Sequence, residues 1–422
     1  MRETLKNETK SKATQLLAYV KDALNVFYPL RRVFSHSQDE RGPRVVALIG
    51  TYKTKKETIS LVNQLLSHNK EIEVLIVDDS TPKEDMSYMN KIKLMAKTKK
   101  RLNTIRTPQN NLKAGAQNFG LEHLKKQKER PDVVVTMDDD AVIFEDTISE
   151  LIKALYANER LGAVCSSVMV ENKDHNLLTR LQALEYHGFN IARAMDEGFF
   201  KGPLVMHGML SAYRMDALNE VEGFQENHLI EDYDITARLK QKGWIVGFAP
   251  KALASTDVPP SLSILWKQRV RWYLGGLFVV KDNIRKPINV IQDFFGHFTL
   301  ISSYLLIALS YLLGRYTQIN DTLVTFLIVL ALLNFVVPTI FGIITLYYYR
   351  QRDIIDVLIR LLIIPEFVYA NILSLVLLGS YFYFVFLGVN RYLQRNKIGS
   401  TIAQHIDRVF HSMGFSQTWG TR

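Results

Sequence analysis

The sequence of 422 residues predicts an α/β domain followed by α-helical transmembrane and interfacial segments. Short apolar runs alternate with helix-like segments between residues 44 and 255, as in a mostly parallel sheet covered by helices on both faces. Three later stretches, 294–314, 322–349 and 367–390, contain no Asp, Glu, Lys or Arg. Because a bilayer core needs ~20 apolar residues per helix, each stretch is long enough to span a membrane. An ordinary soluble enzyme is therefore excluded.

The periodicity of apolar residues assigns the elements of the α/β part. The expected strands are 44–50, 73–78, 132–138 and 163–170. The expected helices are 56–68, 84–97, 113–126, 177–200 and 232–243. Residues 261–285, within the part 256–290, are a second candidate interfacial segment. Two strands run directly into acidic clusters, at 78–80 and 138–140. Ligands of open α/β sheets bind beyond the carboxyl ends of the strands, so we expect both clusters to line one crevice.

The whole chain divides into five parts on this pattern. The parts are 1–43, 44–255, 256–290, 291–390 and a basic tail, 391–422, that ends in Trp-Gly-Thr-Arg. In the first part, apolar residues recur at three- and four-residue steps among lysines and arginines. This pattern predicts a helix that lies on a membrane surface or packs on the α/β domain, and periodicity does not choose between the two.

The net charge is +10, and many basic residues flank the apolar stretches, such as Lys281, Arg285, Arg350, Arg352 and Arg391. This distribution is typical of a cytoplasmic membrane face. Since the basic residues form no stripe with interleaved aromatic residues, we expect no nucleic-acid partner. The location predicted is the plasma membrane, crossed several times, with the α/β domain in the cytoplasm.

The single cysteine, Cys165, supports a reducing compartment for the α/β domain. One thiol makes neither an internal disulfide nor a four-ligand zinc site. The first thirty residues lack a contiguous apolar run, so we expect no secretory signal peptide.

The number of membrane spans stays open between three and an even number. Residues 354–366 contain Asp356, Arg360 and Glu366, so we expect them to lie in the membrane interface. Pro365 supports a re-entrant bend there. A third full span would place the basic tail outside, against the charge rule.

The first candidate for chemistry is the acidic triplet Asp138-Asp139-Asp140 at a strand end. Residues two apart on an extended segment point the same way, so Asp138 and Asp140 are expected to converge. Two converging carboxylates bind a hard divalent cation that bridges phosphate oxygens. The alternative is a solvated turn or a helix cap.

Two further candidates lie near the same expected crevice. Asp79 follows a strand, and its carboxylate suits hydrogen bonds from a base or ribose; it also suits the cap of the next helix. Lys113 begins a helix and suits a phosphate as a point charge, although surface lysines are common.

The last candidates begin the two later helices. Glu231 and Asp232 lie in a first helical turn, where acidic residues are favoured in any case, and one suits a general base. Gln268, Arg271 and Trp272 form a Gln-x-x-Arg-Trp motif in an amphipathic segment. An arginine fork suits a leaving diphosphate, and a tryptophan suits a sugar ring.

Asp79, the Asp138/Asp140 pair, Asp232 and the Gln-x-x-Arg-Trp motif occur in this order before the apolar stretches. This ordered set resembles the processive family-2 glycosyltransferases, which are the cellulose, chitin, hyaluronan and poly-N-acetylglucosamine synthases. The resemblance covers about residues 44–285. Segments 211–214, 230–239 and 265–272 most resemble poly-N-acetylglucosamine synthases, and the tail 419–422 resembles the end of hyaluronan synthases.

The resemblance implies a GT-A-type nucleotide-sugar-binding domain and assigns roles to residues. Those implied to bind the donor are Thr51, Tyr52, Asp79, Lys113, Asp138, Asp139 and Arg271. Those implied to bind the acceptor are Gly208, Glu231, Gln268 and Trp272. Asp138 and Asp140 would bind magnesium or manganese, and Asp232 would be the catalytic base. Two neighbours depart from the family pattern: Lys53 stands after Tyr52, and His207 precedes Gly208.

The implied reaction transfers a sugar, with N-acetylglucosamine the first choice, from a UDP-sugar to a growing β-linked polysaccharide with inversion. Export of the polymer through the membrane part would follow, with a homo-oligomer or an accessory membrane subunit as possible partners. The alternative is a glycolipid synthase that transfers one sugar to a membrane lipid. A third interpretation is a membrane scaffold or transport protein with an inactive nucleotide fold.

Overall fold

The computed structural model describes residues 42–196, 201–226, 228–284, 308, 310–312, 321–395 and 397–416. They divide into two compact units. The first unit contains the described residues up to Glu171 together with Phe189–Asp257. The second contains Asn172–Gly188 and the described residues from Val258 onward. The expected amphipathic helix within 1–41, most of the apolar stretch 294–314 and the tail 419–422 lie outside the described residues.

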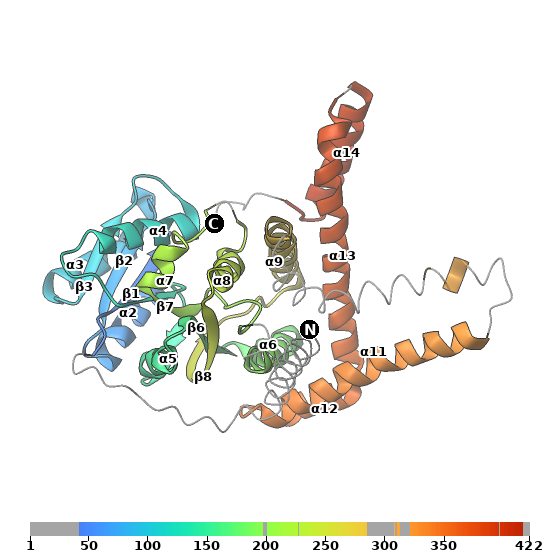
Figure 1. Ribbon diagram of the computed structural model, residues 1–422, viewed down its shortest axis with the longest axis horizontal. Helices are drawn as coiled ribbons and strands as arrows, with labels where there is room; N and C mark the ends of the chain where they lie inside the picture. The colour runs from blue at the N-terminus through green and yellow to red at the C-terminus, as the bar shows by residue number, and fades with distance from the viewer. Residues whose placement is uncertain are drawn as a thin grey trace, which may run out of the picture. The chain divides into compact units, whose positions relative to one another are not determined.

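An eight-stranded sheet forms the centre of the first unit (Figure 1). Its strands are β1 (Val45–Thr51), β2 (Glu73–Asp78), β3 (Leu102–Arg106), β4 (Val133–Met137), β5 (Val142–Ile143), β6 (Leu161–Val170), β7 (Leu210–Arg214) and β8 (Ile245–Thr256). Their order across the sheet is β3-β2-β1-β4-β7-β6-β8-β5. The four strands expected from the apolar runs are β1, β2, β4 and β6.

The sheet is mixed: its first half is parallel, as expected, and its second half combines antiparallel pairs with the parallel pair of β6 and β8. Strands β3, β2, β1 and β4 are parallel neighbours. Strand β7 then runs antiparallel to both β4 and β6, and β5 runs antiparallel to β8. Because β7 is antiparallel to β4, its first residues lie at the carboxyl end of β4, where Asp138 N–H donates to the Met209 carbonyl over 2.9 Å.

Helices cover both faces of this sheet because its strand residues alternate between two apolar surfaces. Leu48 and Val77 belong to a core with α4 (Leu112–Lys125), α7 (Met215–Glu220) and α8 (Glu231–Gln241). The remaining helical elements of this unit are α2 (Lys56–His68), the short η1 (Lys83–Asp85), α3 (Ser87–Thr98) and α5 (Thr147–Tyr156). Every helix expected here from periodicity is present.

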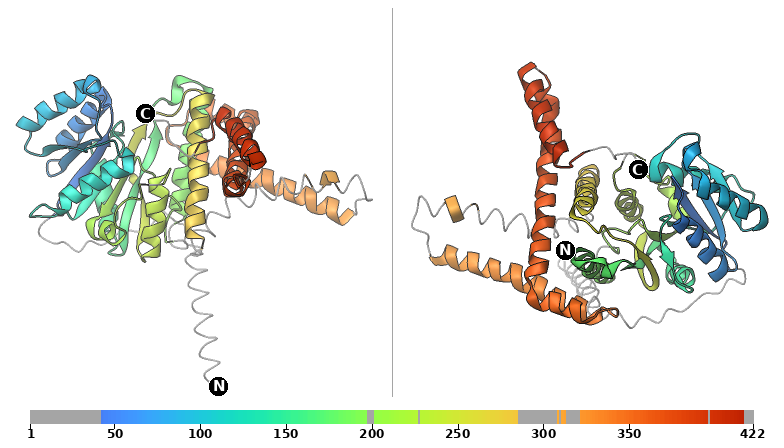
Figure 2. Two further views of the ribbon diagram at one scale, coloured as in Figure 1. Left: turned by 90° about the horizontal axis from the view of Figure 1, so that it is seen from above. Right: turned by 180° about the vertical axis from the view of Figure 1, so that it is seen from behind.

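The second unit is helical. It contains η2 (Lys173–His175), the first half of α6 (Leu177–Met195), α9 (Leu262–Asn283), α11 (Asp321–Tyr348), α12 (Ile354–Leu362), α13 (Ile364–Leu393) and α14 (Lys397–Ser412). An apolar cluster that includes Leu181, Leu265, Ile359 and Tyr369 joins α6, α9, α12 and α13. Figure 2 shows α9 running beside α13, with which it packs. The segment 261–285, expected as interfacial, therefore forms helix α9, one face of which is buried within the second unit.

Within the described residues, one helix is long and apolar enough to cross a membrane, Ile364–Asn390 of α13. The apolar stretch 322–349 corresponds to α11, of which Val336–Tyr348 forms a shorter apolar helix among the residues described. Helix α12 ends at Leu362, Ile363 has a φ of 59°, and Pro365 lies in the first turn of α13. Proline suits a first turn because its missing N–H has no helical partner there, so Pro365 starts α13.

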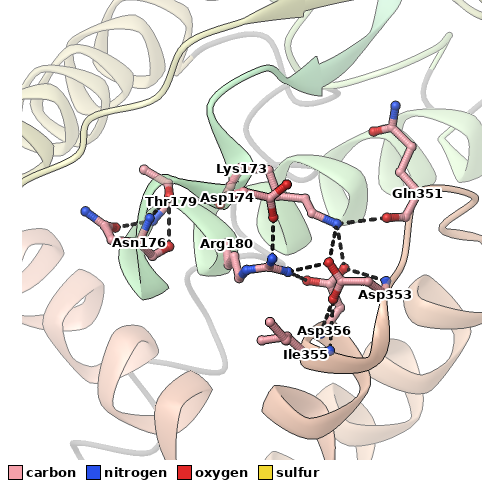
Figure 3. Close-up of polar contacts among 9 residues, drawn as sticks. All are labelled: Lys173, Asp174, Asn176, Thr179, Arg180, Gln351, Asp353, Ile355 and Asp356. Carbon is pink, nitrogen blue, oxygen red and sulfur yellow. Dashed lines mark hydrogen bonds and ion pairs between the residues drawn. The ribbon is translucent and has the colours of Figure 1, made fainter.

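A cluster of charged side chains fastens α12 to the start of α6 (Figure 3). This polar cluster consists of Lys173, Asp174, Arg180, Asp353 and Asp356. Asp356 is completely buried, and its carboxylate contacts Lys173 Nζ at 2.9 Å and Arg180 Nη1 at 3.1 Å. Asp353 caps α12 and bonds the same two cations, at 3.2 and 2.7 Å. The polar face of α12 is thus bound within the unit.

We expect Asp356→Asn to destabilise the second unit strongly. Removal of one partner from a buried ion pair leaves uncompensated charge and costs about 3–5 kcal/mol. The matched control is Asp174→Asn, because Asp174 pairs with the same Arg180 while its side chain is 73% exposed. An exposed pair contributes about 0–1 kcal/mol. Thermal melting of the detergent-purified full chain measures both, and equal melting temperatures for the two variants would contradict the prediction.

Candidate active site

Five of the predicted donor residues lie along one edge of the sheet, at the carboxyl ends of β1, β2 and β4: Thr51, Tyr52, Asp79, Asp138 and Asp139. Thr51 connects two of these ends. Its carbonyl accepts from the Asp79 N–H at 2.8 Å, and its hydroxyl donates to Asp139 Oδ2 at 2.6 Å. The two acidic clusters therefore meet through a single buried threonine on β1, the strand between β2 and β4, in agreement with the expectation that they line one crevice. Tyr52 follows directly and is partly exposed.

Asp79 is buried and is bound by the loop that leads into α4. Its Oδ1 accepts from the Thr107 hydroxyl at 3.0 Å and from the Asn111 N–H at 2.9 Å. The alternative of a cap for the following helix is wrong, because these partners lie about thirty residues further along the chain. Burial raises the pKa of Asp79 above its usual range, against these hydrogen bonds. Thr107 and Asn111 were not predicted.

The acidic triplet turns instead of extending. Strand β4 ends at Met137, and the Ala141 N–H donates to the Asp138 carbonyl at 3.3 Å, which closes a turn over the three aspartates. The expectation that Asp138 and Asp140 lie on extended backbone and point the same way is therefore wrong. Asp138 and Asp139 are partly exposed, and Asp140 is exposed. All three carboxylates remain at the carboxyl end of β4.

Asp138, Asp232, Glu231 and Gly208 meet around the ammonium group of Lys113. Lys113 Nζ lies 2.6 Å from Asp138 Oδ1 and 3.0 Å from Glu231 Oε1. It also donates to the Gly208 carbonyl at 3.1 Å. Asp232 Oδ2 accepts from the Gly208 N–H at 2.8 Å, and its Oδ1 accepts from the Tyr233 N–H at 2.8 Å. One lysine thus neutralises carboxylates that come from β4 and α8.

A side chain at residue 208 would displace the Lys113 ammonium from its position beside the carboxylates. A Cβ at this position would lie 2.7 Å from Lys113 Nζ, 3.3 Å from Glu231 Oε1 and 3.4 Å from Asp232 Oδ2. Its backbone instead presents an N–H to Asp232 and a carbonyl to Lys113. The sequence assigned Gly208 to the acceptor border; the structure shows that it also holds Asp232.

The pKa values of this group follow from its crowding. Burial raises the pKa of Asp232 to about 6, and the Glu231 carboxylate adds to the effect, while Lys113 opposes it. Burial alone would lower the pKa of Lys113, but the charges of Asp138 and Glu231 outweigh it and raise that pKa. The group therefore holds a permanently charged lysine beside a carboxylate that titrates near neutral pH.

The two residues that depart from the family pattern have local partners. Lys53 has a φ of 54° and its ammonium pairs with Asp85 at 3.1 Å. His207 Nε2 lies 2.6 Å from the Ser166 carbonyl, so that nitrogen carries the proton. Burial lowers the pKa of His207 to about 3, and it is neutral at physiological pH.

Helix α9 of the second unit carries the motif residues Gln268, Arg271 and Trp272. Trp272 is partly exposed, and the Arg269 guanidinium lies over its ring with 4.2 Å between the guanidinium carbon and the ring centroid. The centroid of the Tyr186 ring lies 6.4 Å from the centroid of the Trp272 ring. Arg269 and Tyr186 were not predicted.

The donor set after β4 suits a divalent cation that arrives with other ligands. Among the residues that the structure describes, no group of three or more His, Cys, Asp or Glu side chains is placed to hold a metal alone. Magnesium takes one or two carboxylates and completes its shell with phosphate oxygens and water. Asp138 and Asp140 both lie in the turn after β4, and Asp138 already pairs with a cation, the ammonium of Lys113.

Comparison with known proteins agrees with this arrangement. The chain is 26% identical over 241 residues to the poly-beta-1,6-N-acetyl-D-glucosamine synthase of Staphylococcus epidermidis, which covers 57% of this chain and 56% of the relative. It is 25% identical over 232 residues to the synthase of the same name from Staphylococcus aureus strain COL, at 55% and 53% coverage. The chain thus spans about half the length of these curated relatives.

A solved structure establishes the fold. The mannosyltransferase PcManGT from Pyrobaculum calidifontis, solved in complex with GDP-Man and Mn²⁺, superposes with a TM-score of 0.52 at 17% identity. The match covers 81% of this chain and 97% of that chain. The first unit therefore has the mixed α/β sheet of the GT-A type, as the ordered acidic motifs implied.

The sequence pattern described as "Glycosyl transferase family group 2" matches residues 133–347. The matched region is just over half of the chain, and it begins with β4 and contains Asp138, Asp232 and the Gln-x-x-Arg-Trp motif. The chain therefore belongs to glycosyl transferase family group 2.

Proposed function

We propose that this glycosyltransferase transfers a sugar from a UDP-sugar to a growing β-linked polysaccharide, with inversion at the anomeric carbon. N-acetylglucosamine is the sugar that the names of the relatives support best. The observation that carries the proposal is the group around Lys113, in which a network of hydrogen bonds and ion pairs fixes one carboxylate, Asp232, with a pKa of about 6. A general base works best when its pKa lies near the working pH.

In the proposed reaction, Asp232 accepts the proton of the acceptor hydroxyl while that oxygen attacks the anomeric carbon. The new carbon–oxygen bond forms as the bond from the anomeric carbon to the diphosphate oxygen breaks, and UDP leaves with the bonding electrons. The Gly208 N–H donates a hydrogen bond to Asp232 Oδ2 and so holds the carboxylate in place. No covalent enzyme intermediate is needed, and the α-linked donor becomes a β-linked product.

The donor would lie along the carboxyl ends of β1, β2 and β4. We assign the uracil and ribose to Thr51, Tyr52 and Asp79, and the diphosphate to Lys113 and the acidic triplet, Asp139 included. Asp138 and Asp140 would hold a bound magnesium or manganese ion, which supplies positive charge to the leaving diphosphate. The Mn²⁺ in the complex of the structural neighbour supports this choice of cofactor.

The acceptor roles in the proposal belong to Gly208, Glu231, Gln268 and Trp272. Arg271, a permanently charged donor fork, contacts the diphosphate. These roles are carried over from the resemblance of the Gln-x-x-Arg-Trp motif.

We place the protein in the plasma membrane, with the first unit in the cytoplasm and several spans, of which α13 is one. The apolar face of α12 and the start of α13 supports lipid contact, because Leu361, Ile364 and Phe367 are 71%, 70% and 64% exposed while the polar face is bound by the polar cluster. Export of the polymer through the helical part, alone or with a second copy or an accessory subunit, completes the proposal.

The pH dependence of transfer tests the role of Asp232. Because a base must be unprotonated, kcat/KM should fall about tenfold per pH unit below a midpoint near pH 6. The Glu231 carboxylate raises the pKa of Asp232 and the Lys113 ammonium lowers it. Glu231→Gln should therefore move the midpoint to lower pH, and Lys113→Met should move it to higher pH.

Each variant serves as the control for the other. Both should also lose activity because they lack a residue of the site, so the quantity compared is the midpoint of the pH profile of kcat/KM and not the rate. Initial rates with saturating cation between pH 4.5 and 8.5 measure it. A midpoint that stays in place in both variants would assign the acid limb to another group.

Product analysis tests the function itself. The full chain in nanodiscs receives magnesium or manganese with radiolabelled UDP-N-acetylglucosamine, UDP-glucose, UDP-glucuronate or GDP-mannose, singly and in pairs. Products are resolved by size and by glycosidase digestion. We expect a long, water-soluble β-linked product from UDP-N-acetylglucosamine. One labelled sugar per lipid, extracted into organic solvent, would establish the glycolipid synthase, and no hydrolysis or transfer with any donor would favour a scaffold or transport protein.

A further inference from the structure

The second unit contains a buried ion pair next to the Gln-x-x-Arg-Trp motif. Arg269, which lies inside the motif, is 1% exposed and is among the largest fully buried side chains of the described residues. Its Nη2 lies 2.6 Å from Glu185 Oε2 on α6. The hydroxyl of Tyr369 on α13 donates to the same carboxylate oxygen at 2.6 Å, and Arg269 Nη2 lies 3.5 Å from that hydroxyl. One arginine thus connects three helices.

The guanidinium of Arg269 is bound by Glu185 at one nitrogen, and it lies over the ring of Trp272. Its Nε is buried and has no hydrogen-bond partner among the described residues. Its central carbon lies 4.2 Å from the centroid of Trp272, three residues further along α9 and therefore on the same side of the helix. The contact is a desolvated cation–π pair, which fixes the plane of the indole.

Burial of an ion pair is a poor way to stabilise a helix bundle. Apolar side chains of similar volume stabilise such a position equally well or better. A methionine at residue 269 would fill the space without leaving an Nε unpaired. Trp272, in contrast, is partly exposed, so a ligand can reach it. The contact with the Arg269 guanidinium sets the orientation of its ring. The arrangement is explained if the orientation of the ring matters.

We propose that Arg269, held by Glu185 and Tyr369, is a positioning residue that fixes the ring of Trp272 as a flat platform for the acceptor sugar. This inference rests on the proposed function, in which Trp272 binds the acceptor end. Lysine cannot replace arginine here, because an ammonium pairs with Glu185 but has no plane to stack on an indole.

The test separates positioning from stability. The full chain in nanodiscs is titrated with a β-1,6-linked N-acetylglucosamine oligosaccharide, and binding is followed by tryptophan fluorescence and by calorimetry. We expect Arg269→Lys to bind the oligosaccharide about tenfold more weakly and to raise its KM as acceptor, with the Kd of UDP and the melting temperature close to wild type. Glu185→Gln should weaken binding in the same way.

Asp356→Asn is the matched control, because it breaks a different buried ion pair of the same unit, away from Trp272. It should lower the melting temperature and leave the oligosaccharide Kd unchanged. If Trp272→Phe weakens binding and Arg269→Lys does not, the positioning role is overturned and the proposed function stands. If Trp272→Phe leaves binding unchanged, the acceptor role of Trp272 in the proposed function fails, whatever Arg269 does. A loss in Arg269→Lys that Asp356→Asn reproduces would reduce Arg269 to a structural role.

Discussion

Asp232→Asn should abolish sugar transfer and leave UDP binding intact. Asparagine keeps the shape of the side chain, and its amide oxygen still accepts the Gly208 N–H that Asp232 Oδ2 accepts at 2.8 Å. It cannot take a proton from the acceptor hydroxyl. Loss of a general base costs about 10²–10⁴-fold in rate. Initial rates with radiolabelled UDP-N-acetylglucosamine and calorimetry with UDP measure the two effects separately.

Asp234→Asn is the matched control, since Asp234 lies in the same first turn of α8. Its buried carboxylate pairs with Arg238 at 2.6 Å, so this variant should lose stability while the folded fraction keeps its turnover. Loss of UDP binding in Asp232→Asn, or a rate within tenfold of wild type, would count against Asp232 as the base.

Asp138→Asn should remove the dependence of UDP binding on a divalent cation. A hydrogen bond to a charged group is worth about 1.5–3 kcal/mol net, and loss of a carboxylate ligand to a divalent ion costs at least as much, which is about tenfold or more in Kd. Without magnesium or manganese, the variant should bind UDP no more weakly than wild type, because it lacks a negative charge near the diphosphate. Calorimetry with UDP, in magnesium, in manganese and in EDTA, measures the Kd of both proteins in each condition.

The control for this variant is Asp132→Asn, just before the other end of β4, where the carboxylate accepts the Arg44 N–H at 2.8 Å. Its UDP affinity should follow wild type in every condition. A cation dependence that survives in Asp138→Asn would place the metal elsewhere.

Elements with a continuous apolar core were predictable from the sequence. Strand β2 and helix α2 have the predicted bounds, because each is a strongly patterned run that ends at polar residues. The strands β3, β7 and β8 were not predicted. Strand β3 is a polar edge strand, and β8 contains a proline followed by exposed residues, so neither has a clear apolar period. The direction of β7, which runs antiparallel to β4 and β6, makes the sheet mixed.

The candidate site was predictable in its residue types and not in its contacts. Asp138, Asp232 and Lys113 were identified as chemistry-bearing, since acidic residues at strand ends and a lysine at a helix start are visible in the sequence. Their meeting on one ammonium, through the backbone of Gly208, depends on segments 24 to 95 residues apart. Arg269 was missed because a motif read as Gln-x-x-Arg-Trp counts it as a spacer.

The position of β7 between β4 and β6 has a consequence for how the protein is made. Residues 45–137 supply β1 to β4, and the parallel pair of β1 with β4 joins Val45 to Val133. Strand β7 follows later in the chain and connects β4 to β6 in the sheet order. Parallel strands that lie far apart in sequence pair slowly, so we expect the sheet to be completed only after β7 has been synthesised. The group around Lys113 should form at the same late stage, because its ammonium is bound by Gly208 and Glu231, which also lie beyond β6 in the chain.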